Sequence, residues 1–302
     1  MKIRLNKTFT AILKLTLSVA ALAFVFTKID PSAVVRIFGQ SNYLLMLIAL
    51  LLFVFSKYVS AIRLNLFFGS VGVVVDKIYN IKLYLLGMYY NLFLPGGIGG
   101  DGYKIWLLNK DHDVSAKKIF WAVLLDRLTG MMALFSLAVA LALFIRVEVD
   151  FQFKYFIWIL IPLAVLSFYL IIKVFFPDFA GNYIRTSIQA FVVQILQVLS
   201  AYAIFRAIGG TNSTVEYLLL FLISSIVATL PFTIGGIGSR EISFLYGAQI
   251  LNLDQNLSIA LSLAFYIITV FTSFWGIVFI VKGLGGKESG TGRIRKGVGS
   301  RE

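Results

Sequence analysis

The chain has 302 residues, of which 59% are hydrophobic and only 14% are charged, and its mean hydropathy is +0.90. Soluble chains carry about 25% charged residues, and a soluble fold of this size could not hide so much apolar surface. The net charge is +13. Because the charges sit at segment ends and tails, and no nucleic-acid-binding motif is present, anionic lipid headgroups fit them better than nucleic acid.

Metal and disulfide chemistry have little support in the composition. The chain contains no Cys, which excludes disulfides and Cys-based zinc or iron–sulfur sites. Its one His, His112, stands between Asp111 and Asp113. Three adjacent side chains rarely converge on one ion, so we expect a polar loop there, with no metal site and no cofactor.

Apolar segments recur along the whole chain, and a membrane span needs about 20 apolar residues. We expect about eight spans, at residues 9–27, 43–68, 78–94, 119–145, 155–176, 184–208, 214–230 and 257–281. The sequence thus predicts an all-α integral membrane protein with one polytopic membrane domain over residues 1–282. We expect two similar halves, roughly 1–150 and 151–282, and a basic, disordered cytoplasmic tail at 283–302.

The distribution of Lys and Arg predicts the orientation, because cytoplasmic loops are enriched in these residues. The segment before the first span is basic without acids, and the segment after the last span is strongly basic. Both termini are therefore expected in the cytoplasm, which requires an even number of spans. Residues 95–118 conflict with this count, because they would lie outside although they carry several lysines. Either they fold back into the membrane or the count is wrong there.

Two matched motifs interrupt apolar segments. Residues 95–100 read Pro-Gly-Gly-Ile-Gly-Gly, and residues 231–236 read Pro-Phe-Thr-Ile-Gly-Gly. Pro ends a helix, Gly permits unusual backbone, and irregular backbone at membrane depth is expected where it lines a cavity. Such paired breaks point to re-entrant segments at a transporter-like site, although ordinary loops at span ends would explain each motif alone. The proposed break residues are Pro95, Gly96, Gly97, Gly99, Gly100, Pro231, Gly235, Gly236 and Gly238.

The number of spans between the two motifs bears on symmetry. With about eight spans, both motifs start on the same side of the membrane, which favours parallel repeats. One miscounted re-entrant segment would make the repeats inverted.

Charged residues follow both breaks and interrupt the span at 119–145. The candidate headgroup-binding residues are Asp101, Lys104, Asp126, Arg127, Arg240 and Glu241. A charge near the centre of a membrane helix costs roughly 2.5–3.5 kcal/mol, so each needs a partner or water. Because adjacent residues point about 100° apart on a helix, we expect Asp126 or Arg127 to meet a charged residue from one of the breaks.

An anionic headgroup is the ligand that these cations favour. The guanidinium groups of Arg127 and Arg240 would each donate two parallel hydrogen bonds to a phosphate. The alternative is an interhelical ion pair that only fixes packing. We expect Lys57 and Arg63, near the end of their span, to extend to the interface instead.

Three motifs in order resemble the lysylphosphatidylglycerol synthase transmembrane family. They are residues 95–101, the Leu-Leu-Asp-Arg-Leu-Thr-Gly run at 124–130, and the Gly-Gly-Ile-Gly-Ser-Arg-Glu run at 235–241. The resemblance covers nearly the whole chain. It implies the flippase-like part of the bacterial multiple-peptide-resistance proteins, and so a multi-pass protein of a bacterial or archaeal plasma membrane.

This resemblance implies translocation or binding of an anionic or aminoacylated phospholipid, with membrane phospholipids as the partners. Full-length synthases add a soluble aminoacyltransferase domain. Here only a short basic segment follows Lys282, so we expect the stand-alone form without that domain, and not an enzyme.

Two other functions remain open. The first is an intramembrane enzyme of glycolipid or lipid-linked precursor synthesis, with Asp101 or Glu241 as acid or base. The second is an assembly scaffold of the cell envelope, in which the charges serve packing alone. No P-loop pattern is present, so any energy source would be a gradient, and the sequence leaves protein partners open.

Overall fold

The computed structural model describes residues 30–93, 99–145, 151–229 and 238–281, together with the isolated positions 16, 23 and 27. All regular secondary structure in these parts of the chain is helical, as expected. The helices are α2 (Pro31–Gly39), α3 (Tyr43–Ser70), α4 (Lys77–Phe93), α5 (Gly99–Asp111), α6 (Ala116–Ala142), α7 (Phe151–Phe175), α8 (Pro177–Ala180), α9 (Tyr183–Ala207), α10 (Thr214–Thr229), α11 (Ser239–Ile250), α12 (Gln255–Phe274) and α13 (Ile277–Val281).

Five helices in the described residues are long and apolar enough to cross a membrane. They are Tyr43–Ser70, Ala116–Ala142, Trp158–Phe175, Tyr183–Ala207 and Gln255–Phe279, and each coincides with an expected span. The expected span at 9–27 and the expected tail at 283–302 lie outside the described residues. The remaining two expected spans correspond to α4 and α10, which have 17 and 16 residues and fall short of the about 20 that a span needs.

The short helices α4 and α10 each belong to a helical hairpin. α4 packs along α5, and α10 packs along α11. A ring nitrogen of His112, just after α5, lies 3.3 Å from the Val74 carbonyl oxygen, just before α4. In the other hairpin the Tyr217 hydroxyl donates to the Asp254 carbonyl at 3.4 Å and accepts from the Asp254 amide at 3.1 Å. Each hairpin therefore starts and finishes at the same end of the molecule.

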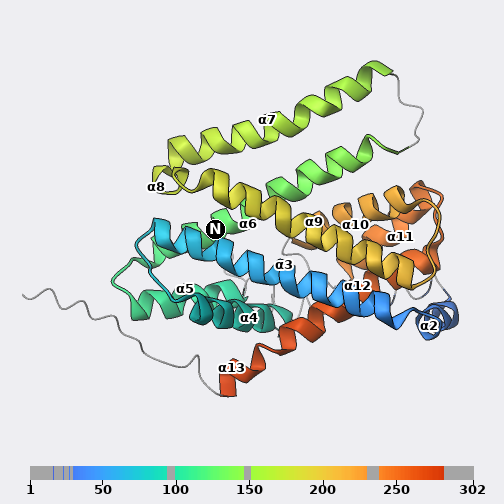
Figure 1. Cartoon of the computed structure of the whole chain (residues 1–302), viewed down its shortest axis with the longest axis horizontal. Helices are drawn as coiled ribbons and strands as arrows, with labels where there is room; N and C mark the ends of the chain where they lie inside the picture. Colours follow the sequence, from blue (N-terminus) through green and yellow to red (C-terminus); the bar gives the residue numbers. More distant parts are fainter. Residues whose placement is uncertain are drawn as a thin grey trace, which may run out of the picture.

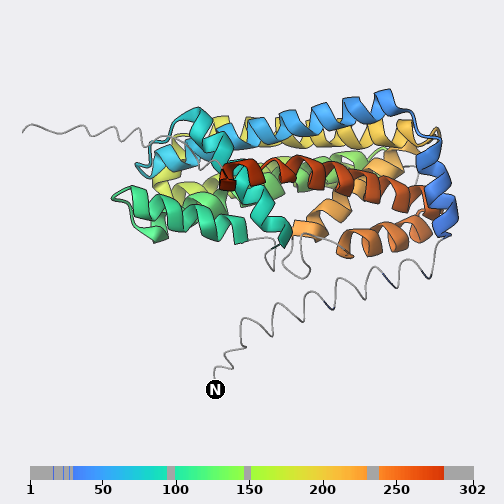
Figure 2. The same cartoon turned by 90° about the horizontal axis from the view of Figure 1, so that it is seen from below.

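The two central long helices, α3 and α9, are antiparallel (Figure 1). The Asn42 amide at the start of α3 donates to the Ala207 carbonyl at the end of α9, at 2.8 Å. At the opposite end, the Asn182 side-chain amide donates to the Ser70 hydroxyl at 3.0 Å. The hairpin after α3 and the hairpin after α9 consequently start from opposite ends of the molecule (Figure 2).

Two series of four helices pack in the same way. The series α3–α4–α5–α6 and α9–α10–α11–α12 each contain a long helix, a short hairpin and another long helix. α6 contacts α9 and α10, while α12 contacts α3 and α4, as an approximate two-fold axis would require. The series run in opposite directions, whereas the count of about eight spans favoured parallel ones. The parallel arrangement followed from counting α4 and α10 as spans, and each span added to or removed from such a count reverses the expected direction of every later helix.

Glycine allows the first hairpin to close. A Cβ on Gly100 would lie 1.9 Å from the Gly87 carbonyl oxygen, so the backbones of α5 and α4 are in direct contact there. The Gly100 amide also donates to the Asn91 side-chain oxygen at 2.8 Å. Small residues permit such close helix contacts inside membranes. This contact brings the start of α5, with its charged residues, against α4.

Candidate functional site

The first charged cluster lies at the start of α5. Asp101 is buried in the first turn of this helix, where free backbone amides favour a negative charge. Arg127 of α6 donates through Nε to one Asp101 carboxylate oxygen, and Lys104 Nζ lies 3.2 Å from the other. Lys104 Nζ also sits 4.7 Å from the centre of the Tyr84 ring on α4. The expectation that Asp126 or Arg127 meets a residue from a break is confirmed by Arg127.

The second cluster is an ion pair between α3 and α6. Arg63 Nε donates to an Asp126 carboxylate oxygen at 2.7 Å, and the two side chains are only 6% and 10% exposed. Arg63 therefore does not extend to the interface, and that expectation is wrong. From the sequence, Arg63 lies in the second half of its span, where a long side chain could reach the interface. Its carboxylate partner, Asp126, is 63 positions further along the chain, so the pair is not visible in the local sequence.

The third cluster lies at the start of α11. Glu241 is buried; its carboxylate accepts from the Gly238 amide at 2.8 Å and from the Ser262 hydroxyl at 3.0 Å. Arg240 donates to the Ser225 hydroxyl at 3.2 Å. Its guanidinium lies 4.9 Å from the centre of the Phe265 ring. Glu241 thus occupies the same third position of its helix as Asp101 does in α5.

Lys57 connects these clusters. It lies in the middle of α3, is partly buried, and holds its ammonium 4.5 Å from the centre of the Phe53 ring. Its charge interacts with those of Arg63 and Arg240. Lys57 was expected to extend to the interface; the structure instead places its ammonium over the buried Phe53 ring, one turn back along α3.

The break residues are described only in part. Gly99 and Gly100 open α5, and Gly238 precedes α11 with a φ of 83°, a left-handed conformation that suits glycine. Pro95, Gly96, Gly97, Pro231, Gly235 and Gly236 lie outside the described residues. A helix thus begins within the first glycine motif and another just after the second, and neither helix was among the expected spans.

Among the described residues, cations outnumber carboxylates in the interior of the helix bundle. The cations of these clusters are Lys57, Arg63, Lys104, Arg127 and Arg240, and the carboxylates are Asp101, Asp126 and Glu241. Each charge is costly among apolar helices, at roughly 2.5–3.5 kcal/mol near the centre of a membrane helix. The excess of positive charge makes this interior suited to an anion.

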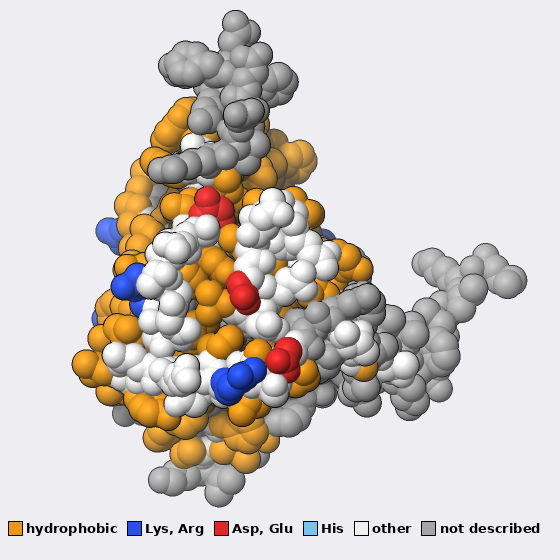
Figure 3. Space-filling model, turned by 90° about the vertical axis from the view of Figure 1, so that its right-hand side faces the viewer, with side chains coloured by type: hydrophobic (Ala, Val, Ile, Leu, Met, Phe, Trp, Pro, Cys, Tyr) orange, Lys and Arg blue, Asp and Glu red, His pale blue; other side chains and the backbone are white. Residues whose placement is uncertain are grey.

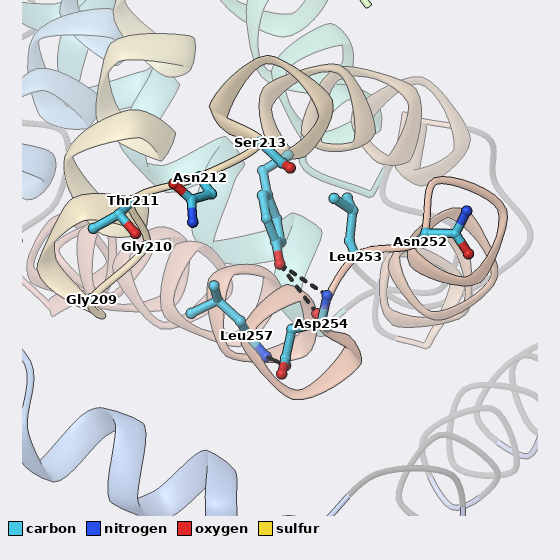
Figure 4. Close-up of a pocket in the computed structure, with 10 residues that line it drawn as sticks. Gly209, Gly210, Thr211, Asn212, Ser213, Asn252, Leu253, Asp254 and Leu257 are labelled. Atoms are coloured by element: carbon cyan, nitrogen blue, oxygen red, sulfur yellow. Dashed lines mark hydrogen bonds between the residues drawn. The ribbon is translucent and has the colours of Figure 1, made fainter. Parts of the chain in front are cut away.

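A polar pocket of about 260 Å³ lies elsewhere, between the turns that precede α10 and α12 (Figure 4). It opens at the end of the molecule shown in Figure 3, where backbone and acidic side chains are surrounded by hydrophobic ones. Asp254 is the charged side chain in its lining, and it accepts from the Leu257 amide at 2.7 Å. No lysine or arginine lines this pocket, so it suits an anionic headgroup less well than the interior does.

A comparison with protein-family models shows which family the chain belongs to. The family model described as the lysylphosphatidylglycerol synthase TM region matches residues 11–181 and 178–276. The chain belongs to this family. The resemblance noted in the sequence motifs is therefore confirmed, and with it a multi-pass membrane protein. No match to a curated protein or to a solved structure was found.

Proposed function

We propose that this protein binds an anionic or aminoacylated phospholipid by its headgroup and moves it between the leaflets of the membrane. The observation that carries the proposal is the position of the charged clusters. Asp101 and Glu241 stand at the starts of two returning half-length helices, inside a bundle of otherwise apolar spans. Charged residues within membrane segments mark substrate pathways more often than lipid-facing surfaces.

The two hairpins are proposed to be re-entrant, entering from opposite faces. Discontinuous helices of this kind form substrate sites near the midplane of transporters, where the starts of half-helices favour anionic groups. The four-helix series then form two inverted repeats, and a headgroup passing between the hairpins would meet first one charged cluster and then the other.

This arrangement also removes the conflict between charge and topology. Lys110, Lys117 and Lys118 return to the same end as Lys77 if α4 and α5 form a hairpin. We assign that end to the cytoplasm of a bacterial or archaeal cell, following the excess of Lys and Arg there and in the C-terminal segment. The five described spans and the expected first span at 9–27 make an even number of crossings, so both termini face the cytoplasm.

The two alternative functions, an intramembrane enzyme and an assembly scaffold of the cell envelope, have less support. Asp101, the first candidate acid or base for an intramembrane enzyme, already forms ion pairs with Lys104 and Arg127, so both of its carboxylate oxygens are occupied. The Arg63–Asp126 pair fits a packing role, because both groups are enclosed and directly bonded. We therefore assign packing to that pair and headgroup binding to the clusters beside the hairpins.

Lipid transport by the purified protein tests the proposal. We expect the wild-type chain, reconstituted in vesicles, to expose inner-leaflet fluorescent phosphatidylglycerol or its lysyl ester to an external quencher. Asp101→Asn should slow this exchange about tenfold or more, equivalent to 1.4 kcal/mol, because Arg127 and Lys104 lose the carboxylate that positions them. Arg36→Gln is the matched control, since Arg36 forms an ion pair at the exposed surface.

The rate with Arg36→Gln should equal that of the wild type. If correctly folded wild-type protein moves neither lipid faster than protein-free vesicles do, the translocation proposal is wrong.

A further inference from the structure

Among the described residues, Lys57 and Arg240 differ from Arg63, Lys104 and Arg127 in having no carboxylate within ion-pair distance. Arg127 and Lys104 share Asp101, and Arg63 is paired with Asp126. In contrast, no carboxylate of the described residues lies within ion-pair distance of Lys57 or Arg240. Each hairpin thus has two cations and one carboxylate beside it, but only near the second do the cations make no ion pair with a carboxylate of the described residues.

The acid next to Arg240 does not neutralise it at close range. The Glu241 carboxylate is turned toward the Gly238 amide and the Ser262 hydroxyl, at 2.8 and 3.0 Å. Arg240 instead donates to the uncharged Ser225 hydroxyl, at 3.2 Å. The Arg240 guanidinium is therefore left with N–H donors that no carboxylate of the described residues accepts.

Three packed aromatic rings connect the positions of Lys57 and Arg240. Phe53 contacts Phe265 with ring centres 5.3 Å apart, and Phe265 contacts Phe221 at 4.6 Å. Lys57 lies over Phe53 at 4.5 Å, and Arg240 lies over Phe265 at 4.9 Å and Phe221 at 5.7 Å. The three rings are almost fully buried. The two cations consequently face one region from α3 and α11.

Cation–π contacts favour this arrangement only weakly, whereas two like charges in an apolar interior repel each other strongly. A bound anion would remove the repulsion and use the free donors. Phosphate fits best, because a guanidinium donates to two of its oxygens in parallel and an ammonium binds a third as a point charge. The start of α11 adds its own partial positive charge.

We infer that Lys57 and Arg240 form the phosphate subsite of this protein, with the Ser225 hydroxyl accepting from Arg240 and so positioning it. The inference rests on the proposed function, since it takes the phosphodiester of a lipid headgroup as the occupant. It also separates the roles of the two hairpins: the second holds the phosphate, and the first presents the ion-paired Asp101 cluster to the remainder of the headgroup.

Binding by the full chain in detergent tests the subsite directly. The probe is water-soluble dihexanoyl-phosphatidylglycerol, and dihexanoylglycerol, which lacks the phosphate, is the matched ligand control. We expect Lys57→Gln and Arg240→Gln each to raise the Kd for the phospholipid about tenfold or more. Lys110→Gln, which removes an exposed lysine at the end of α5, should leave the Kd unchanged.

Folding is controlled by thermal stability. Removing either unpaired cation should leave the Tm of the ligand-free protein unchanged or raise it, because each costs free energy without an anion. A lower Tm in both variants with an unchanged Kd would assign these cations to packing and overturn the subsite. Arg240→Lys should retain part of the affinity, since it keeps the charge but loses the parallel donors.

Inorganic phosphate distinguishes the source of the ligand. Millimolar phosphate should not displace the phospholipid; full displacement would make a free anion the ligand and overturn the lipid assignment. The vesicle transport assay distinguishes failure of this inference from failure of the proposed function. Wild-type Kd values in both variants overturn the subsite even if lipid exchange is observed. Binding that depends on Lys57 and Arg240 supports the subsite even if no exchange is observed.

Discussion

Replacing Asp126 with Asn should lower the free energy of unfolding by about 3–5 kcal/mol, because it leaves the Arg63 guanidinium buried without its counter-charge. The two side chains are bonded at 2.7 Å and are almost completely enclosed. One Arg63 nitrogen, Nη1, already lacks a hydrogen-bond partner in the described structure. Loss of the carboxylate would therefore leave a charge that the surroundings cannot solvate. The measurement is reversible denaturation, or the shift in Tm, of the purified protein.

Two further variants show whether the lost stability comes from the unpaired charge or from the substitution itself. Arg63→Met combined with Asp126→Leu removes both charges and should recover most of the lost stability, since apolar replacement of a buried pair is often neutral. Arg36→Gln breaks an exposed ion pair whose side chains are 71% and 52% exposed, and should change the Tm little. A double variant as unstable as Asp126→Asn would show that the charges are not the cause.

Replacing Gly100 with Ala should separate the two helices of the first hairpin. The added Cβ would stand 1.9 Å from the Gly87 carbonyl oxygen and 2.6 Å from its carbon. Both atoms are backbone, so the clash cannot be relieved by a side-chain rotation. We expect a loss of about 1–3 kcal/mol or more, as for other overpacked positions, and impaired lipid exchange, because α5 carries Asp101. Thermal unfolding and the vesicle assay measure these two effects.

Gly102→Ala, two positions further along the same helix, is the control for this contact. A Cβ there meets nothing within 4 Å, and Ala is favoured over Gly inside a helix by roughly 0.5–1 kcal/mol. The two substitutions should therefore change stability in opposite directions. Equal effects would contradict the close approach of α4 and α5.

Composition and hydropathy were sufficient to predict the helical membrane fold and the positions of its long spans. The burial of Asp101, Asp126 and Glu241 could also be predicted, because each follows a glycine break or interrupts an apolar run. These features are local: a stretch of about 20 residues contains the information.

Partners across helices could not be predicted in this way. Arg63 and Lys57 looked like interfacial side chains because the approach of Asp126 and Arg240 to them depends on the packing of distant segments. Re-entrant segments were expected at both glycine motifs, but α4 and α10 were also counted as spans because they are apolar enough to resemble them. Their contacts with α5 and α11 depend on packing between segments, which local hydropathy does not contain.

Cysteine accessibility tests the central claim, that α4–α5 and α10–α11 are re-entrant hairpins that enter from opposite faces. The chain contains no Cys, so single cysteines can be introduced without further changes. Val74 and Asp113 flank the first hairpin, Asn212 and Gln249 flank the second, and all four are exposed. Each variant is labelled with a membrane-impermeant maleimide in intact and in permeabilised cells.

We expect cysteines at 74 and 113 to be labelled from one side of the membrane, and those at 212 and 249 from the other. Cysteines at 74 and 113 that react from opposite sides would show that α4 crosses the membrane completely, and would contradict the hairpin on which the proposed site depends.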